Sequence, residues 1–440
     1  MTDLIFSSAT SLAEAIREKR VSSAEVVDAY LQRIEAVNPQ LNAVVQLTAE
    51  NAGRRARELD DALVRGEIAG PLHGVPFTVK DWIDTDDAIC AGGLLESKDR
   101  VPKHDATVVA RMRAAGGVML GKTLDGTGGA KNDVYGVCHN PYDLDRTPGE
   151  SSSGEASIVA AGGSPVGLGS DSGGSIRYPA HCCGVAGLKP SAGRVPLTGH
   201  FPRIDSMIDT RTQIGPLARS VEDLALVLSI IAGPDGRDAG VAPMPLGDWR
   251  DVDLHGLRVA TFSEFSHATP DDDTRTAVRN ACRALADAGA IVEEALPPRI
   301  DEAWEITMMY WQRVDSAALT EWQPPREHTL TVDQIERSLF AWGRLRREFL
   351  AWLQSYDAVV CPAAPGPAML LSDTHDPKPF IFTLPFSLTG WPVVVMRAGA
   401  SSGGMPIGVQ VAAQPWRDDV ALAAARQIEV SLGGWQVPSL

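Results

Sequence analysis

The chain lacks the cysteine patterns that mark zinc sites and disulfide scaffolds. Its 440 residues include six cysteines, none of them in a C-x-x-C pair, and no group of cysteines and histidines has the spacing of zinc ligands. We therefore expect no metal site and six buried, reduced thiols. Such thiols are typical of a reducing compartment.

Long apolar runs and an excess of basic residues are also lacking. No apolar stretch reaches the roughly 18 residues that a membrane-spanning helix needs, and the N-terminal segment has no basic stretch followed by an apolar core, as a signal peptide has. The net charge is −16, so a basic face for nucleic acid or for a membrane surface is not expected. These absences predict a cytoplasmic protein that binds neither nucleic acid nor membranes.

Two common serine-hydrolase patterns are missing or incomplete. The GxSxG turn of α/β hydrolases does not occur. A DSGG sequence at 171–174 suggests a chymotrypsin-like nucleophile at Ser172, but none of the nine histidines lies in a context that matches such a triad. His181, six residues after Ser175, is expected to be a packing or capping residue. A serine nucleophile in this chain therefore needs another base.

Helical patterns fill the first 70 residues. Capping boxes are predicted at Ser11 with Glu14 and at Ser22 with Glu25, and Asn38-Pro39 is predicted to end the second helix. We expect these helices to serve packing, and a homodimer, if one forms, to use them.

Strands and helices alternate after residue 70. A short β-type run over Pro76–Val79, an amphipathic helix over 107–116 and the strand-like sequence VMLGKT follow one another. This alternation favours an α/β fold in which helices cover a sheet. A Trp-rich helical segment over 299–355 is expected to be core or the wall of an apolar pocket.

Glycine and serine are concentrated between Arg146 and Pro190. Two turns of small residues, PGESSSG and SDSGGS, flank the apolar segment Ala156–Ala161. Glycine at this density indicates backbone that closely approaches another group, or N–H groups that are free to bind a ligand. The neighbouring hydroxyls are candidate nucleophiles.

Lys80 ends the apolar run that begins at Pro76. A lysine in this position usually reaches solvent. If it is buried instead, the cost of desolvating the ammonium lowers its pKa, and the neutral amine can act as the base that a serine without histidine needs.

The Gly/Ser stretch resembles the signature of the amidase signature family, whose pattern is close to PGGSSGG followed, about two dozen residues later, by GSDxGGSIRxPA. Other segments of this chain resemble parts of the same family in the same order: GVPFTVKD, NPYDLDRTPG, QIGPLARSVEDLA and GMPIGVQVAA. The resemblance spans about residues 10–430 and is weak over 265–355. It implies a single large α/β domain with a central mixed sheet covered by helices on both faces.

Within that domain the resemblance implies a division into N-terminal helices (1–70), a signature core with the catalytic residues (71–235), a variable helical region that walls the pocket (265–355) and the C-terminal part of the core (356–440). It also implies that no cofactor is needed.

The family's Ser–cis-Ser–Lys triad falls on Ser175, Ser151 and Lys80, with Ser175 as nucleophile. Its oxyanion hole falls on backbone N–H groups of four consecutive residues: Ser172, Gly173, Gly174 and Ser175. Ser152 is expected to support the site by bonding Lys80 or the backbone, and Asp171 to hold the loop by accepting backbone N–H bonds. Arg177 is expected to form a structural salt bridge.

Two positions depart from the family pattern, because Glu150 and Ser153 stand where glycine is usual. A Glu150 carboxylate that points toward Lys80 would raise the pKa of the lysine and weaken it as a base. Ser153 is tolerable unless its backbone needs a positive φ.

The resemblance implies an amidohydrolase that cleaves C–N acyl bonds of small or aryl amides, and also esters and carbamates (urethanes), through an acyl-enzyme. Its partners are then a small substrate and water. The first alternative is the glutaminase subunit of a tRNA-dependent amidotransferase, which shares the triad. The second alternative is a non-catalytic binding protein on the same fold.

Overall fold

A mixed sheet organises the part of the chain that the structure describes. This computed structural model describes residues 2–126, 130–201, 209–317, 330–374 and 378–440. Eleven strands of the described residues pair in one sheet, in the order β1 (Val44–Leu47), β3 (Val118–Thr123), β2 (Pro76–Lys80), β6 (Val166–Asp171), β8 (Gln213–Ala218), β7 (Ala186–Lys189), β12 (Val393–Ala400), β13 (Pro406–Ala413), β11 (Ala358–Pro362), β9 (Arg258–Thr261) and β10 (Ile291–Glu294). The short strands β4 (Lys131–Asn132) and β5 (Gly136–Val137) pair separately.

Apart from the edge strand β1, which is antiparallel to β3, the directions of the strands divide the sheet into three parts. Strand β2 runs parallel to β3 and β6, and β9 runs parallel to β10 and β11. In the middle of the sheet, from β6 through β8, β7, β12 and β13 to β11, each strand is antiparallel to its neighbours within this run. The expected mixed sheet is therefore confirmed.

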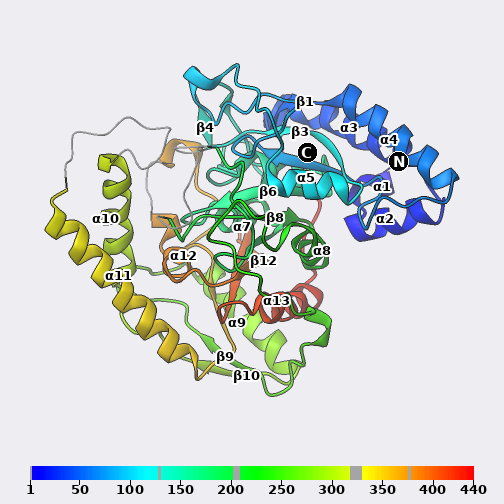
Figure 1. The fold of residues 1–440 in the computed structure, drawn as a ribbon. Coiled ribbons are helices and arrows are strands. Elements are labelled where there is room, and N and C mark those ends of the chain that lie inside the picture. The colour runs from blue at the N-terminus through cyan, green and yellow to red at the C-terminus, as the bar shows by residue number, and fades with distance from the viewer. Residues whose placement is uncertain (1, 127–129, 202–208, 318–329, 375–377) are drawn as a thin grey trace.

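Helices surround this sheet (Figure 1). They are α1 (Thr2–Phe6), α2 (Ala9–Arg17), α3 (Ser23–Leu41), α4 (Ala49–Val64), α5 (Thr107–Ala114), α6 (Ser153–Ala160), α7 (Arg177–Cys183), α8 (Val221–Ile231), α9 (Asp272–Asp287), α10 (Glu302–Ala317), α11 (Val332–Leu353), α12 (Leu384–Thr389) and α13 (Asp418–Leu432). None of the described helices combines the length and the apolar character that crossing a membrane requires.

Both faces of the sheet are covered, as strand β12 shows. Val394 and Met396 belong to the apolar cluster that includes residues of α9 and α13. Val395 packs instead with Ala180 and Cys182 of α7. Because successive side chains of a strand point to opposite faces, α7 lies on one face, and α9 and α13 lie on the other. The predicted α/β fold with helices on both faces is confirmed.

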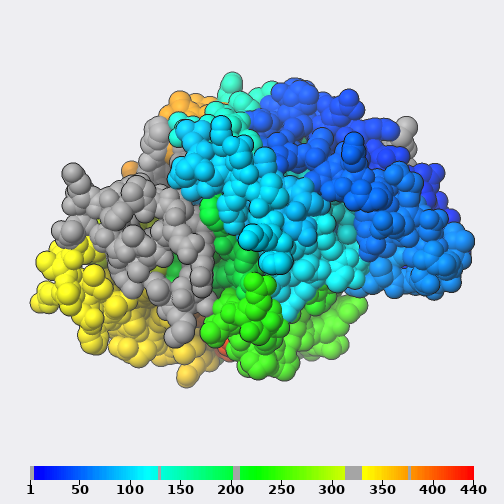
Figure 2. Space-filling model, turned by 45° about the horizontal axis from the view of Figure 1, so that its top comes forward, coloured from blue at the N-terminus to red at the C-terminus, as the bar shows by residue number. Residues whose placement is uncertain are grey.

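The two ends of the molecule are helical. Figure 2 shows the N-terminal helices, in blue, at one end and α11, in yellow, at the other. Helices α10 and α11 pack on each other and on α12. Helix α12 in turn lies beside the loop after β6, because a Cβ at Gly174 would come within 2.5 Å of Thr383, which precedes α12.

Two of the predicted helix boundaries are wrong. Helix α2 is capped by Ser8, whose Oγ accepts the N–H of Ser11, so the predicted box at Ser11 and Glu14 does not form. The capping box at Ser22 and Glu25 is confirmed.

Pro39 does not end helix α3, which continues to Leu41. The proline removes only one N–H near the end of the helix. Asn42 then ends the helix in the left-handed conformation (φ 47°), and the Asn38 side chain accepts the N–H groups of Ala43 and Val44. The short edge strand β1 that follows was not predicted.

Five of the six cysteines are buried, and Cys282 is half-buried. All six are free thiols. The expectation that every one is buried is therefore wrong for Cys282.

Candidate active site

Lys80 is the last residue of β2 and is fully buried. Strand β2 lies between β3 and β6 with helices on both faces, and this explains why each of its five side chains is buried. The ammonium nitrogen Nζ donates hydrogen bonds to Ser151 Oγ at 2.7 Å and to Ser170 Oγ at 3.0 Å. It also lies 4.0 Å from the ring centroid of Trp82.

Burial lowers the pKa of Lys80 to about 7, because desolvation penalises the ammonium. Carboxylates nearby act in the opposite direction and limit the fall: Asp125, Asp171, Glu150 and Glu155. The pKa of Lys80 therefore places its neutral and charged forms in near balance at neutral pH.

Ser151 lies just before α6 and is 6% exposed. The chain enters this turn through Gly149, whose φ of +118° favours glycine and where a Cβ would lie 2.5 Å from Pro179. Glycine at position 149, two residues before Ser151, therefore lets α7 pack closely against the turn.

Ser152 bonds the backbone and not Lys80. Its Oγ donates to the carbonyl of Ser170 at 3.2 Å and lies 3.3 Å from the Ser170 N–H. This pair of contacts ties the serine turn to the end of β6.

The positions that depart from the family pattern fit into the turn. Ser153 does not have a positive φ, and its N–H donates to the Glu150 carbonyl. The Glu150 side chain is half-buried, and its charge raises the pKa of Lys80, after burial, Asp125 and Asp171 in order of size.

Asp171 ends β6 and orders the loop that follows. Its carboxylate accepts the backbone N–H groups of Ile176 (3.1 Å) and Arg177 (3.3 Å) and also the guanidinium of Arg177 at 2.8 and 2.9 Å. Both side chains are fully buried. Burial acts to raise the pKa of Asp171, but Arg177 and the hydrogen bonds outweigh burial, so the pKa is lowered. A charged Asp171 thus holds the start of α7 against the strand end.

The loop at 172–175 needs glycine at Gly174, which has a φ of +144° and where a Cβ would meet Thr383 Oγ1 at 2.5 Å. At Gly173 a Cβ would lie 3.3 Å from the Trp311 ring of α10. The Ser172 hydroxyl bonds Thr212 Oγ1. The loop is therefore enclosed between α10, α12 and the start of β8.

The structure brings some of the predicted site residues into contact, but not all of them. Lys80, Ser151 and Ser152 meet at the end of β6. Ser175 is half-buried, and its Oγ has no hydrogen-bond partner among the residues that the structure describes. A bond between Ser151 and Ser175 is therefore not formed in this structure.

His181 is a packing residue, as expected. Its Nδ1 lies 2.9 Å from the N–H of Gly408 and its Nε2 2.9 Å from the carbonyl of Gly366. No three His, Cys, Asp or Glu side chains within the described ranges converge as metal ligands.

Three residues near Lys80 were not predicted: Ser170 and Trp82, which contact its Nζ, and His200, which contacts both of them. Ser170 Oγ lies 3.0 Å from His200 Nε2, and the His200 ring meets the Trp82 ring edge-on. Ser170 precedes Asp171 in the GSD sequence, so its position was a usable signal. His200 carries no such signal, because only the folding of a distant turn brings it to the site.

Comparison with known proteins connects this geometry to a family. A family model described as Amidase matches residues 25–342 and 328–422. An acylamidase from Rhodococcus erythropolis is 33% identical over 457 residues, which cover 96% of this chain and 94% of that protein. A glutamyl-tRNA(Gln) amidotransferase subunit from Moorella thermoacetica is 33% identical over 480 residues, covering 98% and 97%.

Solved structures agree with this relationship. The structure of 6-aminohexanoate cyclic dimer hydrolase complexed with substrate covers 97% of both chains with a TM-score of 0.84 and 28% identity. A peptide amidase in complex with the inhibitor chymostatin covers 99% of both with a TM-score of 0.83 and 26% identity. The chain belongs to the amidase signature family and is a hydrolase of that family that acts on carbon–nitrogen bonds.

Proposed function

We propose that this hydrolase cleaves small or aryl amides, and also esters and carbamates, through an acyl-enzyme on Ser175. One observation carries the proposal: Lys80 is fully buried, its pKa is lowered to about 7, and its Nζ lies 2.7 Å from Ser151 Oγ. A lysine in this state can accept a proton at neutral pH.

The proton moves in two transfers. Neutral Lys80 takes the hydroxyl proton of Ser151, and Ser151 takes that of Ser175. The Ser175 oxygen then forms a bond to the substrate carbonyl carbon, and the carbonyl π electrons move to the oxygen. Substrate binding has to bring the hydroxyls of Ser151 and Ser175 into contact.

Backbone N–H groups stabilise the oxyanion in this scheme. They belong to consecutive residues of the loop that Asp171 holds: Ser172, Gly173, Gly174 and Ser175. One such donor typically contributes about 3 kcal/mol to the transition state. Asp171 and Ser152 support the site by fixing the two turns, and neither touches the reacting atoms.

Collapse of the tetrahedral intermediate breaks the C–N bond. Ser151 gives its proton to the leaving nitrogen and regains one from the Lys80 ammonium. Water then attacks the acyl-enzyme, gives a proton to the same relay, and releases the acid and Ser175. The same steps apply to an ester or a carbamate.

A hydrolysis screen tests the proposal. Anilides, aliphatic amides, esters and carbamates are offered to the wild type, to Ser175→Ala and to Lys80→Ala, and a labelled fluorophosphonate is applied to each. We expect wild-type turnover and labelling at Ser175, and loss of both in Ser175→Ala. Full activity in Lys80→Ala contradicts the mechanism. An unlabelled wild type that matches Ser175→Ala on every substrate favours a non-catalytic binding protein.

A glutaminase function is the second candidate, because the Moorella amidotransferase protein is as similar to the chain as the acylamidase is. Ammonia release from glutamine distinguishes the two, as does co-purification with a second protein. Turnover of anilides without turnover of glutamine favours the amidase.

A further inference from the structure

Arg211 is a buried arginine whose guanidinium is only partly bonded. The side chain is 2% exposed. Its Nε donates to Asp209 Oδ1 at 3.2 Å, and its backbone N–H donates to the same oxygen at 2.9 Å. Among the residues that the structure describes, Nη1 has no hydrogen-bond partner. A buried charged donor without an acceptor is costly and calls for an explanation.

Arg211 adjoins a residue that contacts the loop at 172–175. Strands β6 and β8 pair Asp171 with Gln213. The hydroxyl bond between Ser172 and Thr212 continues this register by one residue. Arg211 directly precedes Thr212, so its backbone lies one residue from this contact with the loop.

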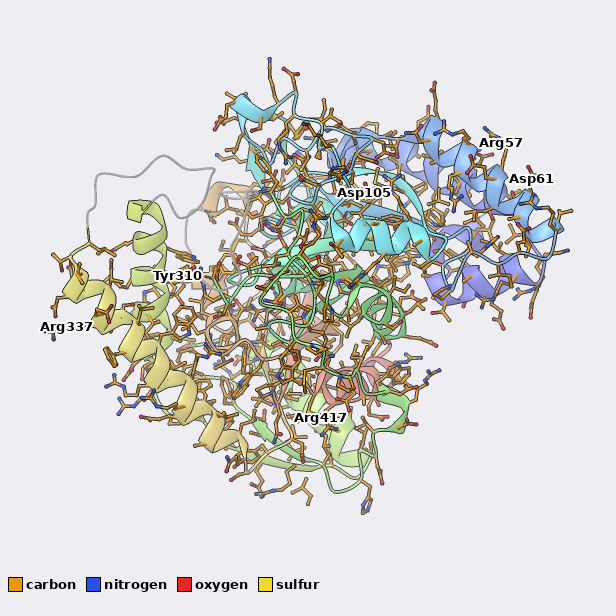
Figure 3. The ribbon with its side chains drawn as sticks, in the orientation of Figure 1. Arg57, Asp61, Asp105, Tyr310, Arg337 and Arg417 are labelled. Atoms are coloured by element: carbon orange, nitrogen blue, oxygen red, sulfur yellow. The ribbon has the colours of Figure 1, made fainter. Side chains whose placement is uncertain are left out.

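The guanidinium and Gly173 both face helix α10. The Arg211 Cζ lies 3.5 Å from the ring centroid of Tyr310. The next residue, Trp311, is the one that a Cβ at Gly173 would approach to 3.3 Å. Figure 3 shows Tyr310 on the side of α10 toward the body of the molecule. Helix α10 thus lies against both the Arg211 guanidinium and Gly173, so Arg211 lies near the loop that holds the substrate carbonyl in the proposed function.

The charge of Arg211 is already balanced. Asp209 pairs with it and also accepts the Thr212 hydroxyl at 2.7 Å. A substrate carboxylate would add a second negative charge beside Asp209 in a buried site, which is costly. An uncharged oxygen, such as an amide or carbamate carbonyl, can accept from Nη1 without this cost.

We propose that Arg211 is a specificity-determining residue that donates from Nη1 to a second, uncharged carbonyl oxygen of the substrate. The inference rests on the proposed function of the 172–175 loop. It names the substrate class as compounds with two carbonyl groups, such as diamides, in which one is cleaved and the other is bound by Arg211.

Arg219 shows that an unpartnered arginine nitrogen alone is not enough. It is also buried and its Nε also has no partner among the described residues, but its two terminal nitrogens bond the carbonyls of Val159, Ser164 and Ser7. These contacts tie the end of β8 to other segments and do not reach the 172–175 loop. Arg219 is thus a matched structural control.

The test compares two series of anilides and aliphatic amides. One series carries a terminal acetamido group, on the acyl side or on the amine side, over a range of spacer lengths. The other carries an apolar propyl group, which has no carbonyl, in its place. We expect wild-type kcat/KM to favour acetamido by about tenfold or more at one spacer length, as a hydrogen bond to a charged donor implies.

The readout is the acetamido-to-propyl ratio, because loss of a partner for Asp209 lowers absolute rates in both series. Arg211→Met keeps an unbranched side chain but removes the guanidinium that lies over Tyr310, and with it the donors, so the ratio should fall to near one. Arg219→Met should destabilise the fold and keep the wild-type ratio.

Three outcomes overturn the inference. A wild-type ratio near one at every spacer length does so, as does a ratio that Arg211→Met leaves intact. The third outcome is that a succinyl or glutaryl half-amide is hydrolysed faster than both series by the wild type but not by Arg211→Met. Arg211 would then bind a carboxylate and not an uncharged carbonyl. Ser175-dependent turnover of the propyl series keeps the proposed function in each case, whereas no turnover of either series removes the proposed function and this inference together.

Discussion

Two strand ends of the same sheet carry a buried lysine, and only one of them has the partners of a site. Lys80 ends β2 and Lys189 ends β7, and both are fully buried. Burial lowers the pKa of each to about 7. Lys80 Nζ meets two serine hydroxyls, whereas Lys189 Nζ donates to the backbone carbonyl of Pro190 at 3.1 Å.

The difference shows that a perturbed pKa does not by itself identify a catalytic base. Structural charge networks shift pKa values as strongly as active sites do. For Lys189, after burial, Arg177 lowers the pKa, while Asp171 and Asp418 raise it. A carbonyl cannot give up a proton and a hydroxyl can, so the partner atom decides which lysine can start a relay.

The largest expected effect separates the two lysines by activity. Lys80→Met should lower kcat by about a thousandfold, within the range for loss of a general base. Lys189→Met, which replaces a similar volume in a similar setting, should keep most of kcat. Steady-state hydrolysis of an anilide that the wild type turns over measures both. Equal losses in the two variants would mean that burial of a lysine, and not its hydroxyl partner, matters.

The pH dependence should follow Lys80. Below pH 7 the folded enzyme holds Lys80 as the ammonium, which cannot accept a proton. We therefore expect kcat/KM to rise tenfold per pH unit up to about 7 and then to level off, so that the rate at pH 5 is about a hundredfold below the plateau.

Lys189 titrates in the same range and supplies the control for this profile. Lys189→Met should keep the rising limb near pH 7. If the limb disappears in Lys189→Met, the group that titrates is Lys189 and the assignment to Lys80 is wrong.

Much of the structure around Lys80 could be predicted from the sequence. The apolar run before Lys80 predicts a buried strand, and the Gly/Ser stretch predicts tight turns. Asp171 accepts backbone N–H groups, as expected from its position before the loop. Each of these features depends on a short stretch of sequence, so a sequence pattern can predict it.

The contacts of Ser170 and His200 could not be predicted in the same way. They depend on β6 lying beside β2 and on the turn at His200 bridging to Ile83. Such pairings join segments roughly 90 to 120 residues apart, and no local pattern encodes which segments meet. For the same reason, no local pattern predicts that Arg211 Nη1 lacks a hydrogen-bond partner among the described residues.

Ser170→Ala should have the next largest effect. It removes one of the two hydroxyls that hold Lys80 Nζ, so the amine is less well aimed at Ser151. We expect kcat to fall about tenfold with KM little changed, the usual size for one buried hydrogen bond to a charged group. Ser157→Ala, which removes a buried serine bond to the His139 carbonyl, is the control. An unchanged kcat in Ser170→Ala would mean that the bond to Ser151 alone positions the Lys80 amine.

The two lysines should contribute equally to the pH dependence of the free energy of unfolding. Each folded pKa of about 7 lies below the ordinary value of 10.5, so between these pH values the unfolded chain binds a proton that the folded chain lacks. Stability therefore rises with pH in this window, by about 1.4 kcal/mol per pH unit for each lysine. Lys80→Met and Lys189→Met should each remove that share of the slope in urea unfolding between about pH 7.5 and 9.5. A change in only one variant would show that the two burial costs differ.

The smallest expected effect concerns Glu150, the acidic residue beside Ser151. Its charge raises the pKa of Lys80, so Glu150→Gln should move the rising limb of the pH profile to lower pH. The side chain is half-buried, and solvent screens its charge, so we expect only about a twofold gain in rate below pH 7 and none on the plateau. Asp125→Asn should move the limb further in the same direction, because Asp125 is buried and its effect on Lys80 is larger. A limb that moves to higher pH in Glu150→Gln would mean that Glu150 acts on the site through the turn and not through its charge.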